Sequence, residues 1–170
     1  MISGTKLRVP IGRTDHLQGP KAAPLVIVEY GDFECAACGW AFFELKNLKK
    51  KMNRNLQLVF RHFPITSVHY DAINAAKAAE AAGLQGKFWK MHDILFENQD
   101  SLDEESLLSF AANLDLDLFK FVEDMSSQLV ERKILTDLFG GAKNGIDRTP
   151  TFFINGFRYE TEALHQKHPL

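Results

Sequence analysis

The chain of 170 residues has the length of one compact domain. Hydrophobic residues make up 45% of it and charged residues 25%, proportions that indicate a folded globular protein and exclude a disordered or fibrous one. The formal charge of -2 gives no reason to expect a nucleic-acid partner. Uncharged apolar runs such as Leu25 to Val28 are far shorter than the roughly 20 residues of a membrane span, so none is expected.

The N-terminus and the cysteine count bear on the cellular compartment. The first residues lack the apolar core, about 7 to 15 residues long, of a secretory signal. We therefore expect a cytoplasmic protein, or a periplasmic one if a leader has been removed. Two cysteines are too few for a disulfide scaffold, and a chain of this length buries a core without one. The two cysteines need another explanation.

The first half of the chain predicts a βαβ unit. Residues 25–30 are apolar on both alternating faces, as in a strand buried between helical layers, and Gly31 ends this strand. A helix is expected from about Cys35 to Met52, and residues 56–60 predict a second strand that stops before Pro64. Two strands joined in this way should be parallel. The apolar residues expected on the inward face of the helix are Trp40, Phe43, Leu45 and Leu48.

The pattern turns helical from about Tyr70 to Gly145. Asp71 to Ala82 contains seven alanines, which are strong helix formers. Ser101 opens a capping box for a third helix, Asp117 is expected to cap a fourth, and residues 129–138 form a further amphipathic stretch. The second helix of the series carries one apolar face, formed by Phe88, Met91, His92, Leu95 and Phe96.

The strand pattern returns after Thr149-Pro150. Residues 151–154 and 157–159 flank Asn155-Gly156, the strongest short signal for a β-hairpin. The sequence therefore predicts an α/β protein with a mixed sheet, whose βαβ half and hairpin half are separated by a helical insertion.

Cys35 and Cys38 directly follow the central strand and open the helix. Their spacing places the two sulfurs one helical turn apart, close enough to bond without large backbone movement. Because the helix N-terminus favours negative charge, Cys35 should have a lowered pKa and supply an attacking thiolate, while Cys38 resolves the mixed disulfide. Two alternatives stay open: the cysteines pack as small buried hydrophobes, or they bind zinc with His62 or His69.

Three acidic side chains closely precede this pair in the sequence, and a histidine lies in the later helical region. Glu29 shares a strand face with apolar neighbours, so its side chain should point into the core, where burial raises a carboxyl pKa. The alternative is a carboxylate at the solvated end of the strand. Asp32 and Glu34 place negative charge before Cys35, which by itself raises the pKa of that thiol. His92 is expected to be a core histidine rather than a ligand.

Four segments together resemble the DsbA-like family of thiol-disulfide oxidoreductases, in the same order as in the family and over about residues 7–160. They are Gly31–Gly39, Arg61–Pro64, Gly86–Trp89 and Arg148–Gly156. The resemblance implies a single domain with a thioredoxin-like fold, a mixed sheet and an inserted helical subdomain. The implied division of residues 1–170 is a thioredoxin part at about 7–64 and 146–160 and a helical insertion at about 65–145.

The resemblance also implies roles for individual residues. Pro150 matches a cis-proline that faces the dithiol, which brings the backbone of Thr149 beside Cys35, where it can pair with an extended substrate peptide. Glu29 matches a buried acid of the family and is expected to accept the proton of Cys38. Without the resemblance, Pro150 would be taken as an ordinary loop proline before an edge strand.

Two departures from the family pattern carry predictions. Ala36-Ala37 stands where members commonly have Pro followed by Tyr or His, and methyl groups donate no hydrogen bond to a thiolate. We therefore expect a redox potential nearer the reducing end of a range of roughly -270 to -120 mV, and a reductase or isomerase. The chain stops at Leu170 after Glu162–His165, where the family has a full helix, so we expect a partly exposed sheet face and with it a homodimer or a loss of stability.

The sequence thus predicts a protein that exchanges disulfides with protein or small-molecule thiols through a mixed disulfide on Cys35. The redox-active pair of Cys35 and Cys38 serves as its own redox group, and no cofactor or metal is expected. The alternative is a non-catalytic thioredoxin-fold module that binds a partner, such as a regulatory domain of a membrane transporter.

Overall fold

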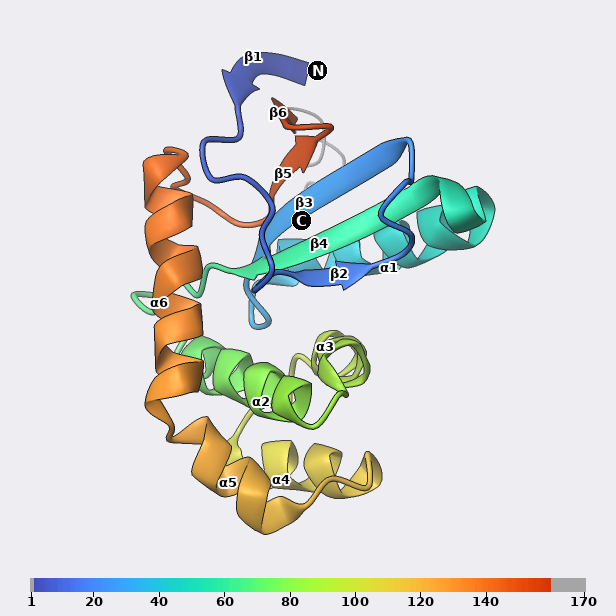
Figure 1. Ribbon diagram of the computed structural model, residues 1–170. Helices are drawn as coiled ribbons and strands as arrows, with labels where there is room; N and C mark the ends of the chain where they lie inside the picture. Colours follow the sequence, from blue (N-terminus) through green and yellow to red (C-terminus); the bar gives the residue numbers. More distant parts are fainter. Residues whose placement is uncertain (1, 160–170) are drawn as a thin grey trace, which may run out of the picture.

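The computed structural model describes residues 2–159, where a six-stranded mixed sheet combines with six α-helices (Figure 1). The strand order β1-β6-β5-β3-β4-β2 confirms the α/β class. The expected truncation after Glu162 lies outside the described residues. The elements are β1 (Ile2–Lys6), β2 (His16–Gln18), β3 (Leu25–Gly31), α1 (Ala36–Met52), a 3-10 turn (Asn53–Asn55), β4 (Leu56–His62), α2 (Ala72–Leu84), α3 (Phe88–Glu97), α4 (Glu104–Asn113), α5 (Leu118–Met125), α6 (Gln128–Lys143), β5 (Thr151–Ile154) and β6 (Phe157–Tyr159).

Strand β3 lies inside the sheet and sets the register of its two neighbours. It runs parallel to β4, as the βαβ pattern predicted, with Glu29 opposite Phe60, and antiparallel to β5, with Glu29 opposite Phe152. The predicted hairpin of β5 and β6 is present, and its turn residues Asn155 and Gly156 have φ angles of 48° and 83°. Positive φ at both positions is the geometry that Asn-Gly favours in a two-residue hairpin turn.

The sequence pattern did not predict the two edge strands. β2 has three residues, which pair with β4, and β1 pairs with β6 at the opposite edge. Segments this short show no alternation of apolar and polar residues that a pattern can detect. Their place in the sheet is decided by the free hydrogen-bonding edges of β4 and β6.

The two faces of the sheet are covered by different parts of the chain. Alternation along β3 places Ile27 on the side of α1, where it packs in one cluster with Ala41. Val28 and Tyr30 lie on the other side, in a cluster with residues of the N-terminal segment. Helix α6 also approaches this side, since a Cβ atom added at Gly140 would come within 3.4 Å of the Tyr30 hydroxyl.

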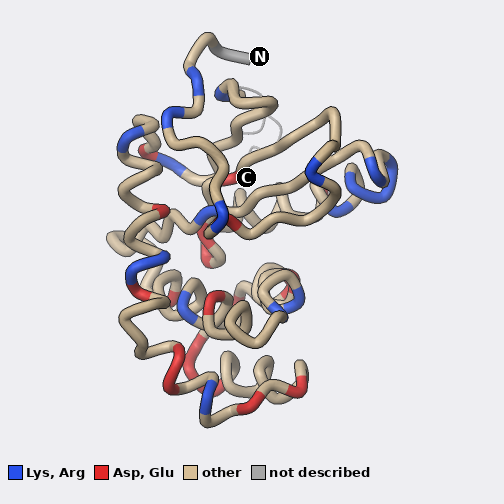
Figure 2. The backbone as a smooth tube through the Cα atoms, viewed as in Figure 1, with Lys and Arg blue, Asp and Glu red and all other residues tan. Residues whose placement is uncertain are grey.

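Helix α1 has the predicted bounds, and Leu45 and Leu48 pack against a core cluster as predicted, but Trp40 and Phe43 do not face inward. Ala41 and Phe42 are buried, whereas Trp40 is 68% exposed and Phe43 is 51% exposed. The buried residues near the start of the helix are Cys38, Gly39, Ala41 and Phe42, and this choice of inward face leaves the rings of Trp40 and Phe43 outside. Lysines occupy the last turn, where positive charge suits the helix dipole, and Figure 2 shows basic residues gathered there.

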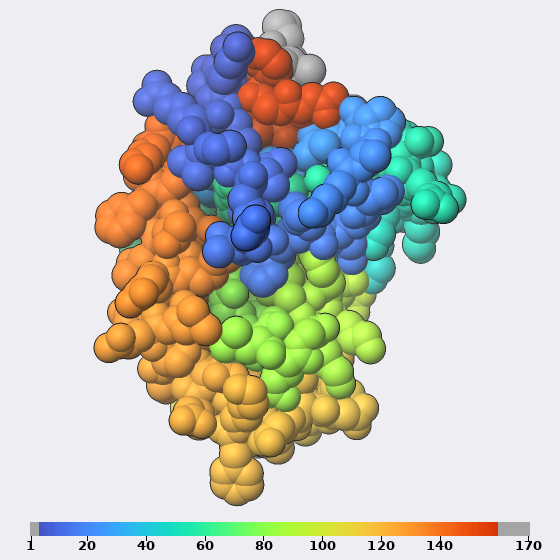
Figure 3. Space-filling model, in the orientation of Figure 1, coloured from blue at the N-terminus to red at the C-terminus, as the bar shows by residue number. Residues whose placement is uncertain are grey.

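Helix α2 is the centre of the helical part of the molecule, which lies beside the β2 edge of the sheet (Figure 1). It contacts α3, α4, α5 and α6, and all seven of its alanines are buried. Methyl side chains permit this close approach of several helices. Figure 3 shows the two parts in continuous contact, and one buried cluster extends from Phe33 and Cys38 into α2 and α3.

The helix caps agree with the predictions in one case and differ in another. Asp117 caps α5, and its carboxylate accepts a hydrogen bond of 3.0 Å from the Lys120 amide. For α4 the cap is Asp103, which accepts from the Ser106 amide at 3.1 Å, and not Ser101 as predicted. Burial of Leu102 places the chain so that Asp103 directly precedes the first turn.

Arg61 fixes the N-terminal segment on the sheet. Its guanidinium group is buried and donates two hydrogen bonds, of 2.8 and 2.9 Å, to the carboxylate of Asp15. It also donates to the hydroxyl of Tyr30 and to the carbonyl oxygens of Val9 and Pro10. This bidentate pair holds the chain that leads into β2 and thereby places His16 beside β4.

Candidate active site

The cysteine pair lies at the junction of β3 and α1, as the sequence predicted. Cys35 is the N-cap residue of α1, and its carbonyl oxygen accepts hydrogen bonds from the amides of Cys38 and Gly39 at 3.0 and 3.1 Å. Cys35 is half-buried and Cys38 is fully buried. The helix therefore presents the first sulfur toward the surface and holds the second one beneath it.

The two thiols differ in their pKa values. The pKa of Cys35 falls to about 5, chiefly because the Cys38 side chain hydrogen-bonds to it; burial opposes the fall, while Thr149 and the amides of Ala37 and Cys38 assist it. The pKa of Cys38 rises well above its usual value, first through burial and then through the hydrogen bond to Cys35 and the charge of Glu29. At neutral pH the first sulfur is a thiolate and the second is a thiol.

The loop before β5 faces the first sulfur. The Thr149-Pro150 peptide bond is cis, and the sulfur of Cys35 lies 3.4 Å from the carbonyl oxygen of Thr149. Among the described residues, the buried hydroxyl of Thr149 has no hydrogen-bond partner. A hydroxyl can donate a hydrogen bond, and the Thr149 side chain contributes to the lowered pKa of Cys35.

Glu29 is buried on the α1 side of the sheet, in keeping with the expectation that its side chain points into the core. Burial and then the charge of Cys35 raise its pKa to about 8. Its Oε1 atom has no hydrogen-bond partner within residues 2–159. Glu29 also lines a pocket of about 310 Å³ between the sheet, α1 and α3, with Phe42, Lys46 and Trp89 among the other lining residues.

Gln99 supports the active-site loop and was missed by the sequence reasoning. Its side-chain amide donates to the carbonyl oxygens of Phe33 and Cys35 at 2.7 and 2.9 Å. A Cβ atom at Gly39 would lie 2.0 Å from the Gln99 side-chain oxygen, so a larger residue at this position of α1 would displace the end of the Gln99 side chain. Gln99 follows α3 in a connecting loop, and no motif in the sequence links it to the cysteines.

The acidic residues before the dithiol are held by hydrogen bonds. The buried carboxylate of Asp32 accepts from the amides of Glu34 and Ile65 and bonds to Nδ1 of His69 at 2.8 Å. Glu34 in turn accepts from the amide of Asp71. These two carboxylates shape the loop, and Asp32 is not among the main causes that set the pKa of Cys35.

His69 lies close enough to the dithiol for the two charges to interact. Burial lowers its pKa, but the bond to Asp32 and the charge of Cys35 outweigh burial, so the net pKa is raised. The structure does not form the zinc site that combined the cysteines with His62 or His69. Within residues 2–159, no metal-ligating cluster includes a cysteine, and His62 bonds to Glu80. His92 is a buried core residue bonded to Asp93, as predicted.

The site is a dithiol centre of the thioredoxin type. It has a half-buried thiolate at the start of a helix, a buried thiol one turn later, and a cis-proline loop against the first sulfur. Residues 12–167 match the family model described as Thioredoxin, so the chain belongs to the thioredoxin family. Within that family it is DsbA-like, as its sequence segments indicated.

Solved structures show the same likeness. A thioredoxin-like oxidoreductase from Silicibacter pomeroyi is 27% identical and superposes with a TM-score of 0.78, covering 86% of this chain and 83% of that one. The α-DsbA1 protein from Wolbachia pipientis is 25% identical, with a TM-score of 0.75 and coverage of 92% and 81%. Both are compared over nearly the whole chain, so the likeness includes the sheet and the helical part.

A relative found by sequence is named as an antiporter rather than as an oxidoreductase. The Na(+)/H(+) antiporter NhaA 1 of Salinispora arenicola is 45% identical over 163 residues, which are 93% of this chain and 25% of that protein. The chain thus spans about a quarter of the length of the curated relatives it matches. None of the helices within residues 2–159 has the length and apolar character needed to cross a membrane.

Proposed function

We propose that this protein catalyses thiol-disulfide exchange through Cys35 and Cys38. The observation that carries the proposal is the opposite shift of the two pKa values, which prepares one sulfur to attack and the other to wait. The Cys35 thiolate attacks a substrate disulfide, so that a bond from Cys35 to substrate forms and the substrate S–S bond breaks. The departing sulfur leaves as a thiolate and takes up a proton.

Resolution of the mixed disulfide needs a base for Cys38, and Glu29 is proposed for this role. While Cys35 is a thiolate, its charge helps to keep Glu29 protonated. Once Cys35 is bonded to substrate that charge is gone, so Glu29 ionises more readily and can take the proton of Cys38. Cys38 then attacks Cys35, the substrate leaves as a reduced thiol, and the enzyme retains a disulfide that a thiol reductant must reopen.

The proposed substrate contact is the backbone around Thr149 and Pro150. The carbonyl oxygen of Thr149 lies beside the reactive sulfur, at the end of the chain that enters β5. An extended peptide whose disulfide reaches Cys35 can use such backbone groups as an added strand would. Binding of this kind recognises the main chain of the substrate rather than its side chains, so it accepts substrates of many sequences.

The direction of exchange depends on the redox potential. Ala36-Ala37 favours a reducing potential. The pKa of about 5 for Cys35, however, lies between the values of roughly 7 in thioredoxin and 3.5 in DsbA, and a lowered pKa stabilises the dithiol form. We therefore propose a potential in the more reducing half of the range of roughly -270 to -120 mV, above that of thioredoxin, which suits disulfide isomerisation. A dithiol with this potential rests reduced in the cytosol, the compartment we propose.

Turnover measurements test this function. Reduced protein is incubated with a protein disulfide or glutathione disulfide in the presence of a thiol reductant, and the rate is compared with that of the reductant alone. We expect a catalysed rate that Cys35→Ser abolishes, and a stable mixed disulfide with substrate when Cys38→Ser is used. A rate equal to that of the reductant would contradict the enzymatic proposal.

A second candidate function follows from the antiporter relative, which is 45% identical to this chain. In that case the dithiol responds to the redox state and regulates a membrane transporter, without turning over a substrate. A disulfide that forms and opens reversibly in this protein, combined with no catalysed turnover, would favour the regulatory function over the enzymatic one.

A further inference from the structure

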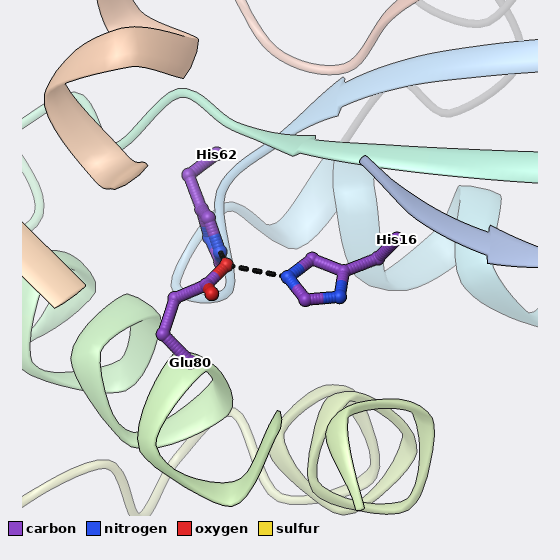
Figure 4. Close-up of side chains that lie close together, drawn as sticks. All are labelled: His16, His62 and Glu80. Atoms are coloured by element: carbon purple, nitrogen blue, oxygen red, sulfur yellow. Dashed lines mark hydrogen bonds and ion pairs between the residues drawn. The ribbon is translucent and has the colours of Figure 1, made fainter. Parts of the chain in front are cut away.

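A second cluster of reactive side chains lies away from the dithiol, where β2, β4 and α2 meet. Figure 4 shows His16, His62 and Glu80 converging from these three elements. The Nε2 atoms of both histidines lie 2.7 Å from the same carboxylate oxygen, Oε1 of Glu80. The ligand atoms of all three residues lie within 4.8 Å of one another.

The cluster is buried and negatively charged at its centre. The side chains of His62 and Glu80 are 1% and 8% exposed, and that of His16 is 20% exposed. Burial opposes ionisation of Glu80, but the hydrogen bonds and charges of the two histidines outweigh it and lower the pKa of Glu80 below its usual range. A buried carboxylate is thus kept ionised by two imidazole groups.

Two imidazole nitrogens and one carboxylate oxygen are a donor set that suits a divalent transition metal. Zinc binds such ligands at about 2.0 to 2.2 Å in a tetrahedron, and three protein ligands leave a fourth position for water. Tetrahedral ligands of this kind lie roughly 3.3 Å apart, so the present 2.7 Å contacts need only a small outward shift around an ion.

The cluster has a route to solvent on the side of β2. His16 lines an open pocket of about 290 Å³ together with Asp15, Gly83 and Lys87. Its ring stacks on Phe88 at 3.4 Å between centroids, which fixes the imidazole plane. An ion can therefore enter beside His16 and keep a water ligand on the pocket side.

We propose that His16, His62 and Glu80 form a binding site for a divalent transition-metal ion, for which zinc is the best match in ligand type. Each histidine binds through Nε2 and carries its remaining proton on Nδ1, so the ion replaces the two hydrogen bonds to Glu80. No redox step is involved. The ion joins two strands of the sheet to the first helix of the helical part, and it stabilises the folded state by binding it.

The test uses protein in which Cys35 and Cys38 cannot ligate, namely the Cys35→Ser/Cys38→Ser double variant. Zn²⁺ is added during calorimetric titration and thermal unfolding, and Co²⁺ serves as a spectroscopic probe. We expect one ion per chain, tetrahedral Co²⁺ absorption bands, and a rise of several degrees in Tm at an ion concentration of about 100 times Kd. Because the thiols are removed, the result is independent of the disulfide-exchange proposal.

Two substitutions locate the site. His16→Ala removes one ligand but leaves the bond between His62 and Glu80, so the variant should fold and lose the ion. Glu80→Gln keeps the shape and a hydrogen-bond acceptor but removes the charge, and it should weaken binding about tenfold or more. His69→Ala is the matched control, because His69 also bonds to a buried carboxylate outside the cluster.

The outcomes are decisive in both directions. Loss of binding in His16→Ala with retention in His69→Ala supports the site. Absence of Co²⁺ bands and of any Tm shift in the double variant would overturn the proposal, as would unchanged binding in folded His16→Ala. In those cases the three residues form a hydrogen-bonded ionic cluster that fastens β2 and β4 to α2.

Discussion

Glu29 and Glu80 are almost equally buried, with 5% and 6% of the whole residue exposed. Their protonation is nevertheless opposite, because Glu29 favours the neutral form and Glu80 the ionised form. Glu29 has an oxygen without any partner within residues 2–159, and its pKa rises to about 8. Glu80 receives two imidazole groups, and its pKa falls below its usual range. Burial alone therefore does not decide the charge of a carboxyl group in this fold; the partners do.

The largest expected effect of this difference between Glu29 and Glu80 is on the pH dependence of stability. The folded-state pKa of Glu29 is raised above the unfolded value of 4.5, so its contribution is most favourable below pH 4.5 and is lost as pH rises toward 8. Glu29→Gln stays neutral and should be more stable than the parent at pH 8, by about 4 kcal/mol. Urea unfolding of both proteins at pH 5 and pH 8 measures this, and an equal difference at the two pH values would contradict it.

Removal of the charge at Glu80 should have the opposite sign. Glu80→Ala leaves the buried imidazole of His62 and the partly buried one of His16 without their shared acceptor and should cost about 3 to 5 kcal/mol of folding free energy near pH 7. Because the folded-state pKa of Glu80 is lowered, this stabilisation is present above pH 4.5 and is lost as pH falls below it. The difference between parent and variant in denaturant unfolding should therefore shrink in acid, and a constant difference would show that it has another origin.

The kinetic role of Glu29 gives the next largest effect. If Glu29 takes the proton of Cys38, Glu29→Gln should slow release of glutathione from a Cys35 mixed disulfide about 100-fold. Formation of that mixed disulfide should change much less, since Cys35 is already ionised at neutral pH. Stopped-flow measurement of the two steps separates them, and equal slowing of both would instead indicate a general disturbance of the site.

The smallest expected effect is that of removing the side chain of Gln99, an uncharged residue that hydrogen-bonds to the active-site loop. Gln99→Ala removes two hydrogen bonds to backbone carbonyl groups and should cost about 1 to 2 kcal/mol. Gln85→Ala is the matched control, because Gln85 also makes two bonds to the backbone, at Asp117, far from the dithiol in sequence. Only the change at Gln99 should alter the alkylation rate of Cys35 at neutral pH. Equal rates in both variants would show that Gln99 does not position the thiol.

Local patterns predicted the features of the fold and site that depend on neighbouring residues. β3 and β4 were predicted from their largely apolar sequences, the dithiol from its place after a strand, and the depth of Glu29 from alternation along the strand. Each of these signals lies within a few residues. The same is true of the Asn155-Gly156 hairpin turn.

The features that sequence did not predict depend on distant segments. The outward turn of Trp40 follows from how Cys38 packs in the core, and the role of Gln99 follows from the position of the loop after α3. The convergence of His16, His62 and Glu80 requires the edge strand β2, which carries no pattern of its own. Separations of 18 to 66 residues divide these partners in the chain, and only the folded sheet joins them.

The approach of Gln99 to Gly39 makes the inserted helices part of the reactive centre. The loop between α3 and α4 packs against the first turn of α1, where a Cβ atom added at Gly39 would lie 2.0 Å from the end of the Gln99 side chain. A displacement of the helical part would therefore move the backbone that carries the sulfur of Cys35. Exchanging this insertion between related proteins should alter the reactivity of the thiol even when every residue of the thioredoxin part is left in place.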